Sequence, residues 1–99
     1  MAYSATKLLS MGLSGGENLV AYDISPDAAT GSVTFSDYTE VYPVAVIPLT
    51  EDSASGAQIA VQAKENGTTA NKVDFKLWSA ANTAATAFKD FRVLLKTVT

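Results

Sequence analysis

Apolar and polar residues alternate with a period of two along much of this 99-residue chain. The alternation is clearest in residues 57–64 and 72–78, and a period of two places successive side chains on opposite faces of a β-strand. The side chains predicted to face the core are Ala57, Ile59, Val61 and Ala63 in the first run, and Val73, Phe75 and Leu77 in the second. Both runs are therefore predicted to be strands with one buried face.

The segment between these two runs contains a turn signal. Asn66 and Gly67 both tolerate positive φ, and the pair is typical of the turns that join antiparallel strands. Residues 57–64 and 72–78 are therefore predicted to form a β-hairpin, although the seven residues that connect them are more than a tight turn needs.

Residues 40–49 form a run that is nearly all apolar. Such a run is typical of a strand buried on both faces, or of a strand at a contact between subunits. Pro43 and Pro48 have no N–H to donate to a β-ladder, so each is predicted to lie at a sheet edge, a bulge or a strand end.

Weaker alternation predicts the remaining strands, and clusters of Ser, Gly and Pro predict the turns between them. The strands are expected at residues 2–11, 17–24, 31–35 and 88–98, the last with Phe91, Val93 and Leu95 on one face. About seven short strands without an amphipathic helix indicate an all-β fold, a single antiparallel β-sandwich or jelly-roll-like domain. Residues 1–16 are predicted to form an N-terminal strand or arm with a Gly-rich turn, and residues 17–99 the sandwich domain.

Residues 79–87 separate the last two predicted strands, and none of these nine small residues is Gly, Pro or charged. Because the segment contains no Gly, it is predicted to be a connector without a special backbone requirement, and its alanine pairs favour one helical turn as its conformation. One interpretation is a plain solvated connector. The other is a loop that packs against another subunit, because charged residues are depleted at the cores of interfaces.

Composition limits the chemistry that the chain can perform. It contains no His and no Cys, which removes the commonest general base and the commonest metal ligands. Asp23, Asp27 and Asp37 do not have the spacing of a calcium-binding loop. The sequence therefore predicts a protein that is not an enzyme, with no catalytic residue, no cofactor and no metal site.

Charge and hydropathy limit the partners. The net charge of −3 argues against nucleic acid, no apolar run is long enough for a membrane helix, and the first residues lack the pattern of a signal peptide. Charged residues make up only 17% of the chain, below the usual quarter, which indicates either many short strands and small-residue loops or a surface that other chains partly cover. Residues 1–56 hold seven of the ten acids and residues 57–99 six of the seven bases. This asymmetry indicates either ordinary solvated faces or charged zones that favour self-association.

Four segments carry a resemblance to a known class of proteins: MAYSATKLLS, AYDISPDAATGSV, VYPVAVIPL and FKDFRVLLKTV. With these segments and its rhythm of short strands and Ala/Thr/Ser loops, the chain resembles small virion proteins of tailed bacteriophages. The resemblance implies a capsid decoration (cement) protein with no catalytic residues. Such a protein is made in the host cytoplasm, forms a homo-oligomer, often a trimer, and binds the major capsid protein of the virion through subunit contacts.

The residues predicted to make those contacts are Leu8, Leu9, Met11, Trp78, Ala80, Ala84 and Thr86. The first three lie in residues 2–11, which are expected to reach a neighbouring subunit, and the others lie in or beside residues 79–87. The alternative is a carbohydrate- or receptor-binding β-sandwich module of a phage tail fibre or baseplate. In that case Trp78, Tyr38 or Tyr42 would stack against a sugar.

Overall fold

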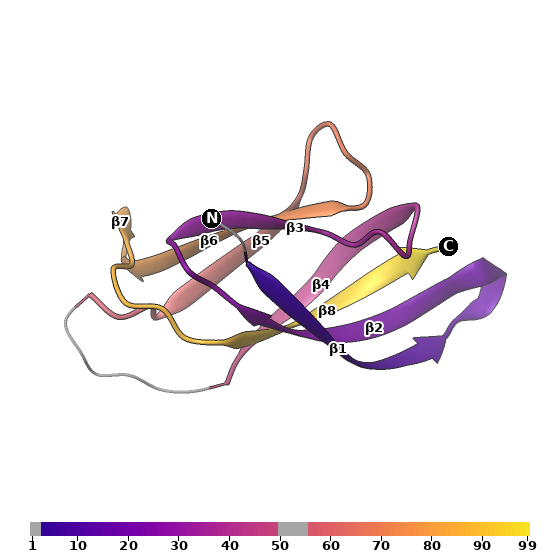
Figure 1. Cartoon of the computed structure of the whole chain (residues 1–99), viewed down its shortest axis with the longest axis horizontal. Helices are drawn as coiled ribbons and strands as arrows, with labels where there is room; N and C mark the ends of the chain where they lie inside the picture. Colours follow the sequence, from indigo (N-terminus) through magenta and orange to yellow (C-terminus); the bar gives the residue numbers. More distant parts are fainter. Residues whose placement is uncertain (1–2, 50–55) are drawn as a thin grey trace.

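Two antiparallel β-sheets pack face to face in the computed structural model, which describes residues 3–49 and 56–99 (Figure 1). Sheet A has the strand order β1-β2-β8-β4, and sheet B has the order β3-β6-β5 with the short β7 paired to the end of β6. The strands are β1 (Ser4–Gly12), β2 (Glu17–Ser25), β3 (Thr30–Thr34), β4 (Glu40–Pro48), β5 (Ala60–Glu65), β6 (Lys72–Ala80), β7 (Thr83–Ala84) and β8 (Phe91–Val98), with a short 3₁₀ turn, η1 (Ser14–Gly16), between β1 and β2. The predicted all-β sandwich is confirmed.

The core lies between the two sheets and follows the predicted alternation. In β8 every second residue is buried, namely Phe91, Val93, Leu95 and Thr97. In β6 the buried residues are Val73, Phe75 and Leu77, as predicted. The rings of Phe75 and Phe91 lie 5.3 Å apart between centroids and join sheet B to sheet A.

Strand β4 lies at an edge of sheet A, where it pairs only with β8 in the sheet order. Most of its residues are exposed or half-buried, so a strand buried on both faces is the wrong interpretation of its apolar run. Pro43 borders the irregularity in the β4–β8 register and Pro48 ends the strand. Both prolines therefore occupy the edge, bulge or end positions that their missing N–H predicts.

The predicted hairpin of β5 and β6 is confirmed, but positive φ does not form its turn. Neither Asn66 nor Gly67 has a positive φ. Instead the side-chain oxygen of Asn66 accepts hydrogen bonds from the backbone N–H groups of Thr68 and Thr69, each at 2.9 Å. An Asn side chain that accepts from the backbone two residues on is a known way to form a turn.

The prediction that the Ile59 side chain faces the core is wrong. The strand β5 begins one residue later, at Ala60, and the Ile59 side chain is 72% exposed. Val61 and Ala63 pack against the core as expected, and Ala57 is buried next to Ala87 through an isolated bridge. Alternation alone could not show that regular strand pairing begins only at Ala60, after the isolated bridge at Ala57.

Residues 79–87 do not form a helical turn, and that prediction is wrong. Strand β6 continues to Ala80, the chain turns at Ala81 and Asn82, and β7 pairs back onto β6. Asn82 has a φ of 60°, a conformation that Asn tolerates better than most residues. The segment therefore does have a backbone requirement, which an Asn meets in place of a Gly.

Residues 4–12 form β1, the other edge of sheet A, and they pair with β2 of the same chain. All nine residues of this strand are exposed. The residue before it, Tyr3, is buried against the core, stacks on Phe75 at 5.9 Å and donates a hydrogen bond from its hydroxyl to the Ala28 carbonyl at 2.6 Å. Tyr3 therefore fixes the start of β1 to sheet B and to the turn between β2 and β3.

Tyr3 makes the stability of the fold sensitive to alkaline pH. Burial, with a smaller contribution from Asp27, raises the pKa of Tyr3 to about 12 from its ordinary value of 10.0. Folding then favours the neutral phenol, so this contribution is intact below pH 10 and is lost as the pH rises through about 12. We expect the urea midpoint of unfolding to fall between pH 9 and pH 12, and to fall less in Tyr3→Phe, which has no group to titrate at this position.

Burial also raises the pKa of Tyr22, so Tyr3→Phe should reduce this alkaline loss without abolishing it. At pH 8 the variant loses only the hydrogen bond to Ala28, which is worth about 1 kcal/mol. An equal alkaline loss of stability in Tyr3→Phe and the parent would show that Tyr3 does not contribute.

Candidate functional site

The residues predicted to make contacts lie on two separate surfaces. Leu8, Leu9 and Met11 are on β1 of sheet A, whereas Trp78, Ala80, Ala84 and Thr86 are on or just after the β6–β7 hairpin beside sheet B. We call the second surface the hairpin end and define it by Ile59, Ala60, Trp78, Ala80, Ala81 and Ala84. The two surfaces belong to different sheets, so each is described separately as a candidate contact surface.

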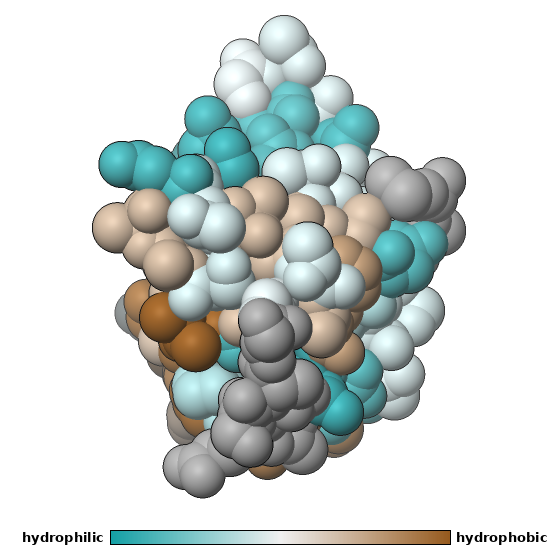
Figure 2. All heavy atoms as spheres, turned by 90° about the vertical axis from the view of Figure 1, so that its left-hand side faces the viewer, coloured by the Kyte–Doolittle hydropathy of each residue, from teal (hydrophilic) through white to brown (hydrophobic). Residues whose placement is uncertain are grey.

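The hairpin end contains an apolar hollow of about 360 Å³. Its lining residues are Ile59, Ala60, Gln62, Trp78, Ala80, Ala81 and Asn82, and none of them is charged. Figure 2 faces this end of the molecule, where apolar atoms gather across the middle of the surface and hydrophilic atoms lie above them. The lining of the hollow therefore combines one aromatic ring with small and apolar side chains and no charge.

The indole of Trp78 is held in place at the edge of this hollow. Its ring N–H donates to the Gln62 side-chain oxygen at 2.9 Å, and the Lys76 ammonium lies 4.4 Å from the ring centroid. A cation over an aromatic face is attracted by the ring quadrupole. Trp78 is therefore a partly covered ring that Gln62 and Lys76 hold at the surface.

Backbone hydrogen bonds fix the hairpin end from behind. The N–H groups of Thr86 and Ala87 both donate to the Gly56 carbonyl, at 2.8 and 3.2 Å, and Ala85 donates to the Leu77 carbonyl at 3.0 Å. Ala85 is also buried, so this part of the small-residue segment packs against its own chain. Thr86 stays exposed, and its hydroxyl points back to Gly56 at 3.4 Å.

Sequence reasoning missed two members of the hairpin end, Ile59 and Ala60. The alternation in residues 57–64 assigned Ile59 to the core, and only the exact start of β5 reveals its exposure. The strand register then places Ala60 directly beside Trp78. No local signal in the sequence indicates that pairing.

The other surface, which carries Leu9 and Met11, is the face of sheet A that points away from sheet B, and we call it the outer face. Paired residues of neighbouring strands point to the same side of a sheet, so the register gives three rows across β1, β2, β8 and β4. The rows are Leu9–Ala21–Leu94–Ala45, Met11–Leu19–Lys96–Tyr42 and Thr6–Asp23–Arg92–Ile47. Leu9 is 60% exposed and Met11 is 53% exposed.

Charged groups on the outer face are paired within the chain. The Arg92 guanidinium donates to both carboxylate oxygens of Asp23, at 2.8 and 3.3 Å, and this hydrogen bonding raises the pKa of Arg92. Lys96 lies 3.1 Å from a carboxylate oxygen of Glu17 and 5.0 Å from the ring centroid of Tyr42. Strand β8 thus pairs two bases of the second half of the chain, Arg92 and Lys96, with two acids of the first half, Asp23 and Glu17.

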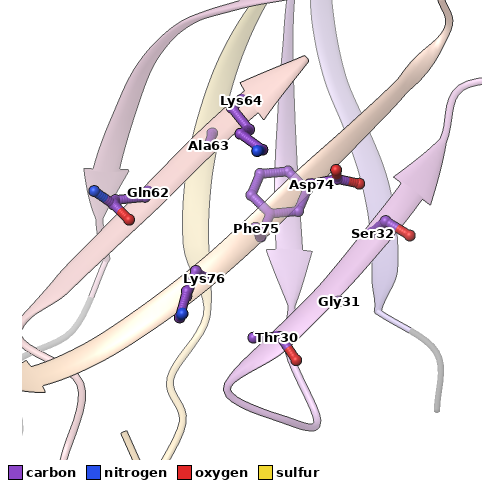
Figure 3. A pocket seen from close by; sticks show the side chains of 9 residues that line it. All are labelled: Thr30, Gly31, Ser32, Gln62, Ala63, Lys64, Asp74, Phe75 and Lys76. Atoms are coloured by element: carbon purple, nitrogen blue, oxygen red, sulfur yellow. The ribbon is translucent and has the colours of Figure 1, made fainter. Parts of the chain in front are cut away.

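A third feature is an open depression of about 590 Å³ on the outside of sheet B. Figure 3 shows its polar side chains, which are Thr30 and Ser32 of β3, Gln62 and Lys64 of β5, and Asp74 and Lys76 of β6. Asp74 accepts hydrogen bonds from the Asn66 amide at 3.1 and 3.3 Å. These groups include no nucleophile held by a general base, so the depression offers no evident catalytic arrangement.

The three aromatic residues considered for sugar stacking differ in access. Tyr38 is buried, with the Lys7 ammonium 5.5 Å from its ring centroid. Lysines also lie over Tyr42 and Trp78. Both of these rings are half-buried, and a sugar stacked on either one would have to displace the lysine or use the opposite face.

Within residues 3–49 and 56–99 there is no group of three or more acidic residues placed to hold a metal ion. In the same part of the chain, no helix is long and apolar enough to cross a membrane. No protein-family model, no curated protein and no solved structure matches the chain. Its function is therefore proposed from its own surfaces.

Proposed function

We propose that the chain is a structural virion protein of the capsid-decoration type, which binds the phage head through its hairpin end. The observation that carries this proposal is the uncharged, rigidly held surface of Ile59, Trp78 and the alanines of the β6–β7 hairpin. The resemblance of the sequence to small phage virion proteins is the reason for proposing a phage head as the particle that the chain binds. The partner is then the outer surface of the major capsid protein.

Binding would proceed by burial of apolar area without chemistry. Ile59 is the most exposed large apolar residue in the described chain, at 72%, and covering such a side chain contributes roughly 1.5–3 kcal/mol. Alanine side chains have no rotamer freedom to lose on docking. The backbone hydrogen bonds to Gly56 and Leu77 hold the surface in one conformation, which reduces the entropic cost of binding.

The substitution Ala84→Arg should weaken binding to the head about tenfold to a hundredfold. An unpaired charge inside a desolvated contact costs on the order of a few kcal/mol. Ala84 is exposed in the free chain, so the melting temperature should stay close to that of the parent. The measurement is co-sedimentation of purified protein with phage heads that lack it.

The matched control is Ala70→Arg, an equal change at an exposed alanine in the loop between β5 and β6. This variant should bind heads like the parent. If Ala84→Arg binds as well as Ala70→Arg, the hairpin end is not the docking surface and the proposal fails.

A further inference from the structure

The outer face of sheet A has a pattern that is complementary to itself. Its central row reads large, small, large, small across the four strands, as Leu9, Ala21, Leu94 and Ala45. Read in the opposite direction, the same row is small, large, small, large. Two copies of the row laid against each other in opposite directions would place each leucine over an alanine.

We propose that two copies of the chain pack face to face through their outer faces, about a two-fold axis that runs parallel to the strands between β2 and β8. Rotation about this axis keeps each row at its own level and reverses the order of the strands. Strand β2 then lies over β8 of the second copy, and β1 lies over β4. Such an interface is isologous, which is the commonest arrangement in homodimers.

Side-chain size supports this arrangement. Leu94 of each copy lies over Ala21 of the other, beside the axis, and Leu9 lies over Ala45 further out. Ala21 is small and only 4% exposed, and it lies between the larger Leu9 and Leu94 of its own row. Interdigitated side chains of this kind fill the space between packed sheets, which lie about 10 Å apart.

Charge supports the same axis. In the row Thr6–Asp23–Arg92–Ile47, the acid is on β2 and the base is on β8. The rotation places Asp23 of each copy over Arg92 of the other, so opposite charges meet at the point where the two sheets come together. Each carboxylate is already bound by the guanidinium of its own chain, which limits the cost of covering both groups.

A rotation about an axis across the strands would not bring opposite charges together, because it would place Arg92 over Lys96 of the second copy. The second copy is the occupant that fits, since the order of sizes in the central row and the order of charges in the row of Asp23 and Arg92 are their own complements. The face is roughly 20 Å across, at the small end for a stable interface. The dimer is therefore expected to dissociate in the micromolar range.

The first test is the mass of the purified chain by sedimentation velocity and light scattering, from low to high micromolar concentration. The expected result is a shift from 10.4 kDa toward twice that mass as the concentration rises. A constant monomer mass, or a mass of three chains, would overturn the two-fold pairing.

The second test separates this face from the hairpin end. Leu94→Lys should abolish the dimer, whereas Ile59→Lys, an equal change on the hairpin end, should leave it intact. Loss of the dimer in both variants, or in neither, would contradict the proposed face. Since Ile59→Lys is expected to affect binding to heads and Leu94→Lys to affect the mass, failure of one proposal is distinguishable from failure of the other.

The third test changes the order of large and small side chains in the central row. Ala21→Leu places a leucine over Leu94 of the second copy and should raise the dissociation constant about tenfold or more. The double variant Ala21→Leu/Leu94→Ala changes the row to large, large, small, small, which again places each leucine over an alanine of the second copy, so it should recover most of the parent affinity. A double variant as weak as Ala21→Leu alone would overturn the axis between β2 and β8, and circular dichroism confirms that each variant is folded.

Discussion

Phe91→Ala should lower the free energy of unfolding by about 3–5 kcal/mol, the usual cost of removing a buried phenylalanine. Phe91 is fully buried at the start of β8, where it pairs with Ile24 of β2 and Pro48 of β4. Its ring also contacts Phe75 of the opposite sheet. Removing it would leave a cavity where both sheets meet, and a domain of this size has only about 5–15 kcal/mol of stability to lose.

The measurement for Phe91→Ala is chemical unfolding in urea, followed by tryptophan fluorescence and far-UV circular dichroism. Val44→Ala is the control, because Val44 is 60% exposed and its truncation should change stability by less than about 0.5 kcal/mol. Similar losses in the two variants would mean that Phe91 is not at the centre of the core.

Gly31→Ala should destabilise the fold by about 1–3 kcal/mol, in the range of overpacked cores. A β-carbon at Gly31 would lie 2.5 Å and 2.6 Å from two ring carbons of Tyr3. Tyr3 is fixed by Phe75 and by its hydrogen bond to Ala28, so it cannot move away without losing those contacts. The smaller gain from replacing a glycine within a strand, roughly 0.5–1 kcal/mol, does not offset this clash.

A double-mutant cycle tests this cause directly. With Tyr3→Ala already present, the ring is absent and Gly31→Ala should become neutral or stabilising by up to about 1 kcal/mol. The unfolding free energies of the parent, the two single variants and the double variant give the coupling. A loss of the same size in both backgrounds would show that Tyr3 is not the obstacle.

Much of the fold could be predicted because its strands follow one simple rule. Alternation located β6 and β8 and their buried residues, and the missing N–H of Pro43 and Pro48 placed both at positions outside a continuous ladder. The helical turn predicted for residues 79–87 was wrong because one residue of this segment has a special backbone conformation. Asn82 turns the chain with a positive φ in a run of alanines that has helical propensity, so tertiary pairing with β6 overrides that propensity.

The candidate surfaces were only partly predictable, because they depend on register between distant strands. Leu9 and Met11 could be recognised as apolar residues on an exposed strand, but Ala21, Leu94 and Ala45 join them only through pairings across sheet A. Ile59 and Trp78 likewise line one hollow only because strands β5 and β6 pair with each other. A single sequence predicts which faces of strands are apolar, and it does not predict which strands become neighbours.

The position of β8 between β2 and β4 also determines the order in which the sheet can assemble. Glu17 and Glu40 both pair with Val98, so neither central ladder of sheet A can close until the chain has folded back over most of its length. Pairings between such distant residues are slow to form, on the order of milliseconds to seconds in β-sandwiches. During that interval the apolar strand β4 has no partner and could pair with other chains. Pro43 and Pro48 interrupt its ladder of donors, so the same two residues that shape the finished edge also protect the unfinished one from aggregation.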